Sequence, residues 1–199
     1  ELKMLKGKRI GVGISSSFCS LEKSLKALEN LKAQGADLYI ALTNFITKQD
    51  SRFMSKETLI KKLQALTSHP LIETIHDAEV YGPFEPLDMV IILPCSANTL
   101  AKLSYGLCDN AVLMLAKSTL RHLHPIVLGL FTNDALGSSG VNIMKLMNTK
   151  NFYFIPFGQD DPIKKPNSMV CNPEYLIPTC LYALNKRQIQ PVILGGDDL

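Results

Sequence analysis

The chain has 199 residues, of which 46% are hydrophobic and 20% charged, with 12 Gly and 11 Pro. These figures exclude a disordered segment, a collagen-like repeat and a disulfide-rich miniprotein. The formal net charge of +3 comes without a polybasic block, so nothing in the charge pattern indicates a nucleic-acid partner. Apolar runs such as residues 89–93 are far shorter than the ~20 residues that span a bilayer, and we expect a soluble protein.

Apolar β-type runs alternate along the chain with longer segments of helical periodicity. The sequence predicts strands over residues 9–14, 37–42, 89–93, 125–130 and 152–156. It predicts helices over residues 21–34, 56–66, 98–104, 111–120, 141–147 and 175–185. Gly35 is placed to end the first of these helices, and Pro94 is expected to break the central strand.

Continuous apolar strands between amphipathic helices are typical of a parallel sheet that is covered on both faces. The predicted fold class is therefore α/β, a three-layer α/β/α Rossmann-like (flavodoxin-like) parallel sheet, in one domain over residues 1–199. Residues 157–199 are expected as a C-terminal extension that packs on this domain. Ligands of such sheets bind beyond the carboxyl ends of the strands, so the loops that follow the strands are the expected site.

The loop after the first predicted strand, residues 11–19, reads Gly-Val-Gly-Ile-Ser-Ser-Ser-Phe-Cys. Its backbone N–H groups and Ser hydroxyls can converge on an anion at the start of the next helix. It is not a Rossmann G-x-G-x-x-G motif, because Ser16 stands at the third glycine position, and no Gly-Lys-Ser/Thr makes it a Walker P-loop. The alternative is that one of the serines only caps the helix.

Two further loops carry polar groups at the same edge of the predicted sheet. Thr43 and Asn44 follow the second strand, where the alternative interpretation is an ordinary turn. Residues 94–101 follow the central strand, and their small side chains let the backbone approach a flat ligand. Asn98 and Thr99 add polar groups at a helix start.

Residues 94–101, Pro-Cys-Ser-Ala-Asn-Thr-Leu-Ala, fit the pattern P-x-S-x-x-T-[LIVM]-A, and residues 105–112 are similar to the G-[IL]-x-D-[ND]-L segment that follows it. These motifs resemble those of the homo-oligomeric flavin-containing Cys decarboxylases. That flavoprotein family includes phosphopantothenoylcysteine decarboxylases and flavin prenyltransferases. The resemblance covers about the first two thirds of the chain, although the family's usual second glycine of the first loop is Ser16 here.

The resemblance implies that the chain binds FMN. The implied phosphate site is formed by Gly13, Ser15, Ser16 and Ser17, with Thr43 beside them. The residues implied along the flavin ring are Cys95, Ser96, Asn98 and Thr99. In the family the Asn that matches Asn98 lies beside the flavin and contacts a substrate carboxylate, which an amide can do by donating its NH₂. The alternative for Asn98 is a helix N-cap. No catalytic base and no metal site is recognised.

The C-terminal third narrows the resemblance to one branch of the family, through residues 132–137, 148–151, 157–168 and 190–193. That branch is one component of a two-component oxidoreductase that forms an aromatic pyridine dicarboxylate in sporulating bacteria. The resemblance implies a cytoplasmic protein of the mother cell, a nicotinamide-binding A subunit with NADP as its cofactor, and a homo-oligomer of three or more chains.

A dianionic substrate needs cations or N–H donors for its carboxylates. Lys164 and Lys165 form a basic turn between prolines that could close over the site, and Arg52 and Lys102 are other candidates. The alternative for the two adjacent lysines is a solvated turn whose partners are neighbouring aspartates.

The decarboxylases carry a His-Ile/Val pair upstream of the central strand, where this chain has no His in residues 80–87. Cysteine decarboxylation is therefore disfavoured, and His76 is a displaced candidate with a surface or capping role as its alternative. The other hypotheses are another FMN-dependent enzyme of the same fold, a decarboxylase or prenyltransferase, and a non-catalytic structural partner of the A subunit. Five widely spaced cysteines indicate reduced thiols, and Cys95 is interpreted as a packed residue rather than a nucleophile.

Overall fold

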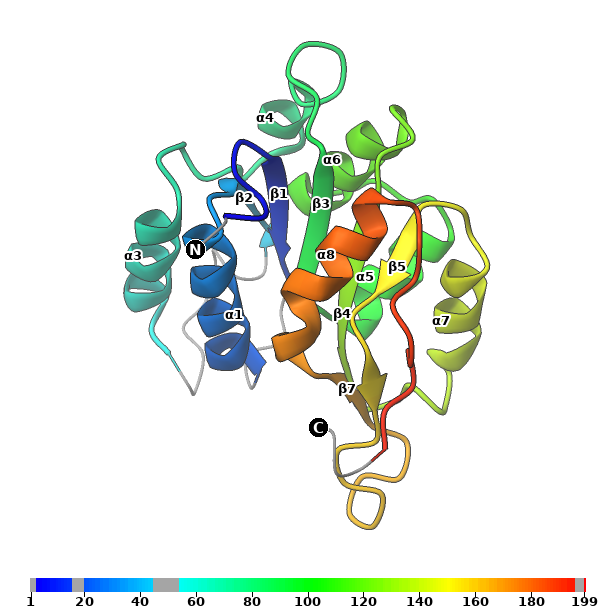
Figure 1. Ribbon diagram of the computed structural model, residues 1–199. Helices are drawn as coiled ribbons and strands as arrows, with labels where there is room; N and C mark the ends of the chain where they lie inside the picture. Colours follow the sequence, from blue (N-terminus) through cyan, green and yellow to red (C-terminus); the bar gives the residue numbers. More distant parts are fainter. Residues whose placement is uncertain (1–2, 16–19, 45–53, 196–198) are drawn as a thin grey trace.

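A computed structural model describes residues 3–15, 20–44, 54–195 and 199. The described chain forms a seven-stranded sheet between two layers of helices (Figure 1). The strands are β1 (Arg9–Ile14), β2 (Asp37–Leu42), β3 (Met89–Cys95), β4 (Ile126–Thr132), β5 (Phe152–Phe154), β6 (Phe157–Gly158) and β7 (Met169–Cys171). The helices are α1 (Leu21–Ala33), α3 (Lys56–Leu66), α4 (Ile75–Glu79), α5 (Ala97–Ser104), α6 (Ala111–Leu120), α7 (Gly140–Met147) and α8 (Leu176–Leu184), with a short 3₁₀ helix η2 (Pro173–Tyr175) before α8.

The five main strands are parallel and lie in the order β2-β1-β3-β4-β5. The chain therefore leaves β1 toward β2 on one side and returns to β3 on the other side of β1. This reversal between β1 and β3 is a topological switch point, where the loops at the carboxyl ends of the two strands separate and leave room for a ligand. The strand order places the candidate site at the carboxyl end of β1 and β3.

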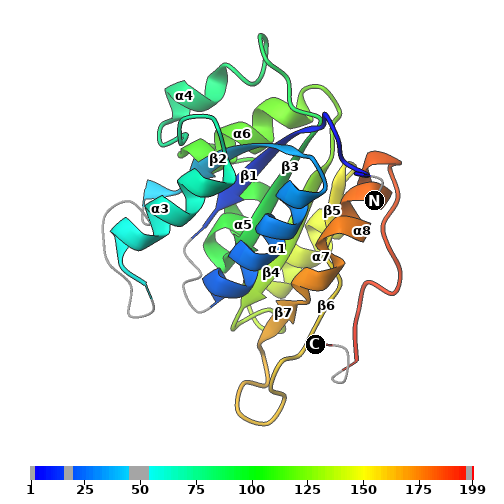
Figure 2. The same cartoon turned by 60° about the vertical axis from the view of Figure 1, so that its left-hand side comes forward.

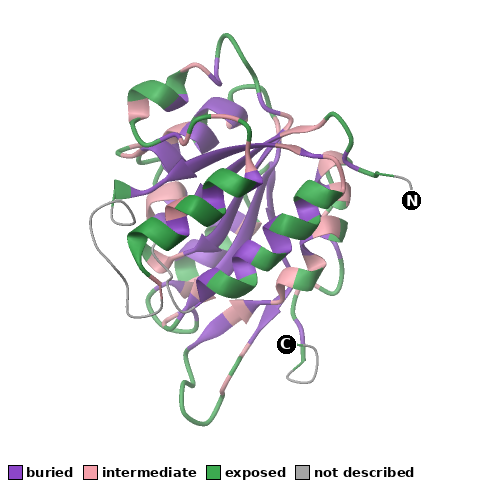
Figure 3. Cartoon of the chain, turned by 90° about the vertical axis from the view of Figure 1, so that its left-hand side faces the viewer, coloured by how far each residue is buried: buried purple, intermediate pink, exposed green. Residues whose placement is uncertain are grey.

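Helices α1 and α8 cover one face of the sheet, and α5, α6 and α7 cover the other (Figure 2). Helix α3 packs beside α1, and α4 packs beside α6. The strand residues are almost entirely buried between these layers, as the purple interior of Figure 3 shows. The three-layer, single-domain α/β fold predicted from the alternating apolar pattern is confirmed.

Helix α6 lies close against β1 because two residues of that strand have no side chain. A Cβ atom at Gly13 would lie 2.6 Å from Cγ1 of Val112, and one at Gly11 would lie 2.9 Å from Cδ2 of Leu115. Val112 and Leu115 belong to α6. The glycines of the first loop motif are therefore needed for packing of α6 on the sheet.

Every predicted strand and helix is present, with ends within two residues of the predicted ones. One expectation about the central strand is wrong: Pro94 does not break β3, which continues to Cys95. The pairing with β4 shifts by one residue between Ile92 and Cys95. Proline, which has no N–H to donate to a ladder, is tolerated at such irregularities. The Leu93–Pro94 peptide bond is cis.

The C-terminal residues add strands that the sequence did not predict. Strand β7 is antiparallel to the last part of β4, with Phe131 opposite Val170 and Thr132 opposite Met169, and β6 pairs with β7. The sheet is thus mostly, not wholly, parallel. Helix α4 was also missed, since its five residues are too short to show a helical period.

Candidate functional site

The candidate site is built on a side chain that joins the carboxyl ends of β1 and β3. Ser15 follows β1 and is fully buried. Its hydroxyl donates to the carbonyl oxygen of Pro94 at 2.7 Å and accepts from the N–H of Ser96 at 2.8 Å. The Ser15 N–H donates to the same carbonyl at 3.3 Å. Ser15, which the family resemblance implies as a phosphate ligand, here holds the loop that leads into α5.

Helix α5 begins directly beyond this junction, and its N-cap residue is Ser96. The Ser96 hydroxyl accepts from the N–H of Thr99 at 3.3 Å and donates to the Thr99 hydroxyl at 3.2 Å. The alternative that Asn98 caps this helix is therefore wrong, because a cap precedes the first turn and Asn98 lies within it. Asn98 is exposed, and its side chain makes no hydrogen bond to any residue that the structure describes. Its amide is free to meet a ligand at the switch point.

Thr43 follows β2, the strand that neighbours β1 on the side away from β3. Its N–H donates to the carbonyl of Ile14 at 3.2 Å, which places Thr43 next to the end of β1. The Thr43 side chain is only 9% exposed, and its buried hydroxyl oxygen has no hydrogen-bond partner among the described residues. A buried polar atom without a partner costs free energy, so this hydroxyl is available to bond a ligand at the end of β2.

Helix α1 is the first helix after β1 in the chain. Its N-cap residue is Ser20, whose side chain makes no capping hydrogen bond. Ser16 and Ser17, implied as phosphate ligands, lie outside the described residues. Gly13 is described, but it faces Val112 of α6, and packing of α6 explains this glycine. Among the described residues next to the end of β1, the Thr43 side chain is therefore the one that carries an unbonded buried hydroxyl.

The remaining residues implied along the flavin ring point inward. Cys95 is fully buried, and burial raises the pKa of its thiol to about 12. A thiol with that pKa stays protonated at neutral pH and is a poor nucleophile, in agreement with its interpretation as a packed residue. Thr99 is 3% exposed and bonded to Ser96. Only Ser96 and Asn98 of this loop therefore present polar side chains outward.

The loop after β4 is an ordered part of the same edge that sequence reasoning missed. The Asp134 carboxylate accepts hydrogen bonds from the hydroxyls of Thr132 at 2.5 Å, Ser138 at 2.8 Å and Ser139 at 2.9 Å. These hydroxyls, Thr132 foremost, hold the pKa of Asp134 below its usual value. The available signal was a Thr-Asn-Asp turn directly after a strand, followed by two serines before a helix.

The two candidate substrate lysines lie on an exposed turn between β6 and β7. Lys165 forms an ion pair with Asp160 at 3.1 Å, and the Lys164 N–H donates to the Asp161 carboxylate at 2.9 Å. This is the geometry of the solvated turn that was the alternative. Of the other cationic candidates, Lys102 pairs with Asp109, and residue 52 lies outside the described chain.

The described residues contain neither a cluster of metal ligands nor a membrane-spanning helix. Within the described ranges, no three His, Cys, Asp or Glu side chains gather as metal ligands would. No helix of the described chain is long and apolar enough to cross a membrane. His76 lies exposed on α4, at the rim of a pocket between α4 and α6 and not among the residues at the switch point.

Comparison with known proteins shows the family of the chain. A family model described as Flavoprotein matches residues 1–173. The dodecameric FMN-dependent Ubix-like decarboxylase from Escherichia coli O157:H7 has the same fold, with a TM-score of 0.58 at 18% identity over 74% of this chain and 79% of that one. The chain belongs to the flavoprotein family.

Two relatives place it more narrowly. The dipicolinate synthase B subunit of Bacillus subtilis (strain 168) is 44% identical over 193 residues, which are 97% of this chain and 96% of the relative. The crystal structure of the dipicolinate synthase B subunit from Bacillus halodurans C superposes with a TM-score of 0.89 at 41% identity, over 96% of this chain and 98% of that one. Within the flavoprotein family, the chain groups with the dipicolinate synthase B subunits.

Proposed function

We propose that this chain is the FMN-binding subunit of a dipicolinate synthase. It acts with an A subunit that holds NADP, and together they oxidise dihydrodipicolinate to dipicolinate in the mother-cell cytoplasm of a sporulating bacterium. The observation that carries this proposal is 44% identity to the Bacillus subtilis relative over nearly the whole of both chains. The buried Thr43 hydroxyl, which lacks a partner among the described residues, supports a bound ligand at the same edge of the sheet.

The described residues fit FMN at two places. The Thr43 hydroxyl and the first turn of α1 would hold the phosphate, since N–H groups at a helix start and a hydroxyl can satisfy a dianion. Ser96 and Asn98, at the start of α5, would lie along the ring. Ser15 orients that loop through its bonds to Pro94 and Ser96. When bound, the flavin would supply an acceptor for a hydride equivalent.

Substrate recognition is assigned to Asn98. Its exposed amide projects from the first turn of α5, where the helix dipole favours negative charge. The NH₂ group would donate to one substrate carboxylate. Asn98→Asp sets a like charge against that carboxylate, so product formation in the complex with the A subunit should fall while the melting temperature stays near that of the wild type.

The proposed oligomer is supported by an apolar surface. Tyr105 and Leu107 follow α5, and Leu136, Val141 and Met144 precede or lie in α7; each of these side chains is more than half exposed. Helices α5 and α7 are joined by a hydrogen bond from the Ser104 hydroxyl to Asn142 at 2.7 Å. Large contiguous apolar patches mark interaction sites. We assign this α5–α7 surface to self-association.

The flavin assignment is tested by titrating FMN into the purified chain and following its absorbance and fluorescence. Thr43→Val keeps the shape of the side chain and removes only the hydroxyl, so it should weaken FMN binding. Thr119→Val is the matched control, because Thr119 also has a buried hydroxyl without a partner among the described residues but lies in α6. Equal FMN affinity in the wild type and Thr43→Val would remove the phosphate assignment.

The division of labour is tested by steady-state assays of dipicolinate formation. The isolated chain should show little or no turnover, and activity should appear when the A subunit is added. Full activity of the isolated chain would contradict the need for a partner. Activity of the complex without any flavin would instead favour a structural role for this chain.

A further inference from the structure

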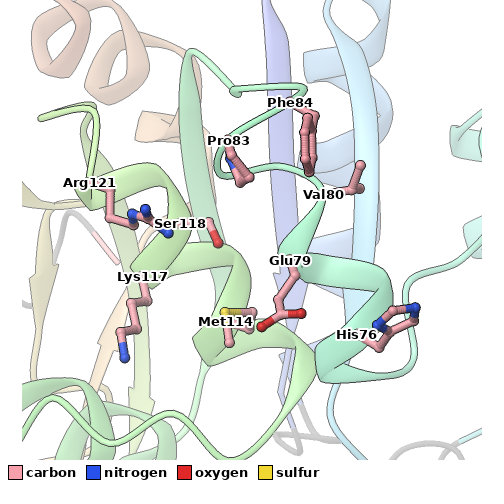
Figure 4. A pocket seen from close by; sticks show the side chains of 9 residues that line it. All are labelled: His76, Glu79, Val80, Pro83, Phe84, Met114, Lys117, Ser118 and Arg121. Carbon is pink, nitrogen blue, oxygen red and sulfur yellow. The ribbon is translucent and has the colours of Figure 1, made fainter.

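A pocket of about 540 Å³ lies between α4 and α6, away from the residues at the switch point (Figure 4). Small-molecule sites typically have volumes of about 300–1,000 Å³, so this pocket is large enough for a single-ring compound. It is lined by α4, the loop that follows it, and the outer side of α6. No residue of this pocket belongs to the proposed flavin site.

The polar feature of this pocket is the Ser118 side chain on α6. Ser118 is 3% exposed, and its hydroxyl makes no hydrogen bond to a residue of the described chain. Figure 4 shows the hydroxyl directed into the pocket. Unlike the hydroxyl oxygens of Thr43 and Thr119, the Ser118 oxygen is not fully enclosed, so solvent in the pocket can reach it. A ligand atom in the pocket would replace that solvent as its hydrogen-bond partner.

The charges around Ser118 favour an anion at one end of the pocket. Lys117 and Arg121 lie one helical turn apart and line the same pocket as Ser118. Both are exposed, and neither forms an ion pair with a residue that the structure describes. Glu79 lies on the facing helix, α4, with His76 beyond it (Figure 4). Figure 4 shows Arg121 directed toward Ser118 and Lys117 extending away from the space between the helices. The cationic group beside Ser118 is therefore Arg121, and Glu79 carries a carboxylate on the α4 side.

The space between these charges is apolar. Val80 and Met114 line the pocket, and Phe84 is 78% exposed at its mouth. A Phe so exposed offers a ring face to a flat partner. The loop that carries Phe84 is fastened at both ends: the His122 ring bonds to the Gly82 carbonyl at 2.7 Å, and the His124 ring bonds to the Leu87 carbonyl at 2.6 Å.

We propose that the α4–α6 pocket binds a small aromatic monocarboxylate. The ligand carboxylate bonds to the Ser118 hydroxyl and the Arg121 guanidinium, which forms strong paired bonds to carboxylates. Its ring lies against Phe84 and Met114. Glu79 disfavours a second carboxylate at the opposite end of the ring. The proposal concerns a second ligand site and does not depend on flavin binding.

The test is a calorimetric titration of benzoate into the full chain. Arg121→Gln and Ser118→Ala should each weaken binding, Arg121→Gln by about tenfold as expected for loss of a charge-assisted pair. Arg187→Gln is the control, because Arg187 is an exposed arginine outside this pocket. Thr43→Val should leave benzoate affinity unchanged, which separates this site from the proposed flavin site.

Two further probes examine the ligand class. Benzyl alcohol, which keeps the ring and lacks the charge, should bind more weakly than benzoate. Terephthalate, with carboxylates at both ends of the ring, should bind more weakly than benzoate in the wild type and recover affinity in Glu79→Gln. No benzoate binding, or equal binding by Arg121→Gln and the wild type, would overturn the proposal. If the wild type does not bind benzoate and Phe84→Asp changes the oligomer size, the pocket is instead assigned to contact with a second copy of the chain.

Discussion

Two buried hydroxyls lie at the carboxyl edge of the sheet, one after β1 and one after β2, and they differ in what they bond. The Ser15 hydroxyl donates to Pro94 and accepts from Ser96, so its capacity is used inside the protein. The Thr43 hydroxyl is as well hidden but has no partner in the part of the chain that the structure describes. The same chemical group at the same edge is thus bonded within the protein in one place and left unbonded within the described chain in the other.

The largest expected effect comes from removing the bonded hydroxyl. Ser15→Ala leaves the part-buried Ser96 N–H without an acceptor and deletes the buried bond to Pro94, which together should cost about 3 kcal/mol of unfolding free energy. For a chain of this size the melting temperature should fall by roughly 6–12 °C. Ser24→Ala is the control, since Ser24 is also buried but bonds only to Ser20 within its helix segment. Urea unfolding of both variants measures the difference, and equal losses would break the comparison.

Gly13→Ala should have the next largest effect. The added Cβ would meet Cγ1 of Val112 at 2.6 Å, an overpacking that costs about 2 kcal/mol. Val112→Ala removes the atom in the way, so the double variant should regain stability relative to the sum of the single changes. If Gly13→Ala weakens FMN binding only by disturbing the packing of α6, the double variant should regain FMN affinity together with stability. Stability that returns without FMN affinity would restore Gly13 as a phosphate ligand.

The loop after β4 gives a smaller effect that depends on pH. Hydroxyls of Thr132, Ser138 and Ser139 lower the pKa of Asp134, so the folded state binds this proton less readily than the unfolded state. The carboxylate therefore stabilises the fold above pH ~4, and this contribution is lost as the pH falls through the lowered pKa. Asp134→Asn should reduce the loss of unfolding free energy between neutral and acid pH. An acid profile that Asp134→Asn leaves unchanged would show that the loop does not respond to this charge.

The smallest effect on stability is expected where the hydroxyl has no partner. Thr43→Val, measured without flavin, should change the unfolding free energy by less than about 0.5 kcal/mol or raise it, because no bond is lost and a desolvated polar atom is removed. Excess FMN should raise the melting temperature of the wild type more than that of the variant. A large loss of stability in Thr43→Val without flavin would show that Thr43 is bonded within the protein.

The sequence predicts the sheet well because β1, β2, β3 and β4 are continuous apolar runs between helices of clear period. It also locates the edge where Ser15, Thr43 and Asn98 lie. What it cannot show is which hydroxyl is already bonded, because Ser15 meets Pro94 across 79 residues of sequence. The two short antiparallel strands have too few residues to carry a pattern.

Strand β4 changes its neighbour partway along its length. Residues Ile126 to Leu128 pair with β5, and Phe131 and Thr132 pair with β7. The outermost strands on this side, β5 and β6, are three and two residues long, and on the other side β2 is bridged by Ile72. Long free edges recruit strands from other molecules and lead to aggregation. Because the described sheet leaves little backbone unpaired at either margin, a contact with another chain would have to use the side chains of its helices.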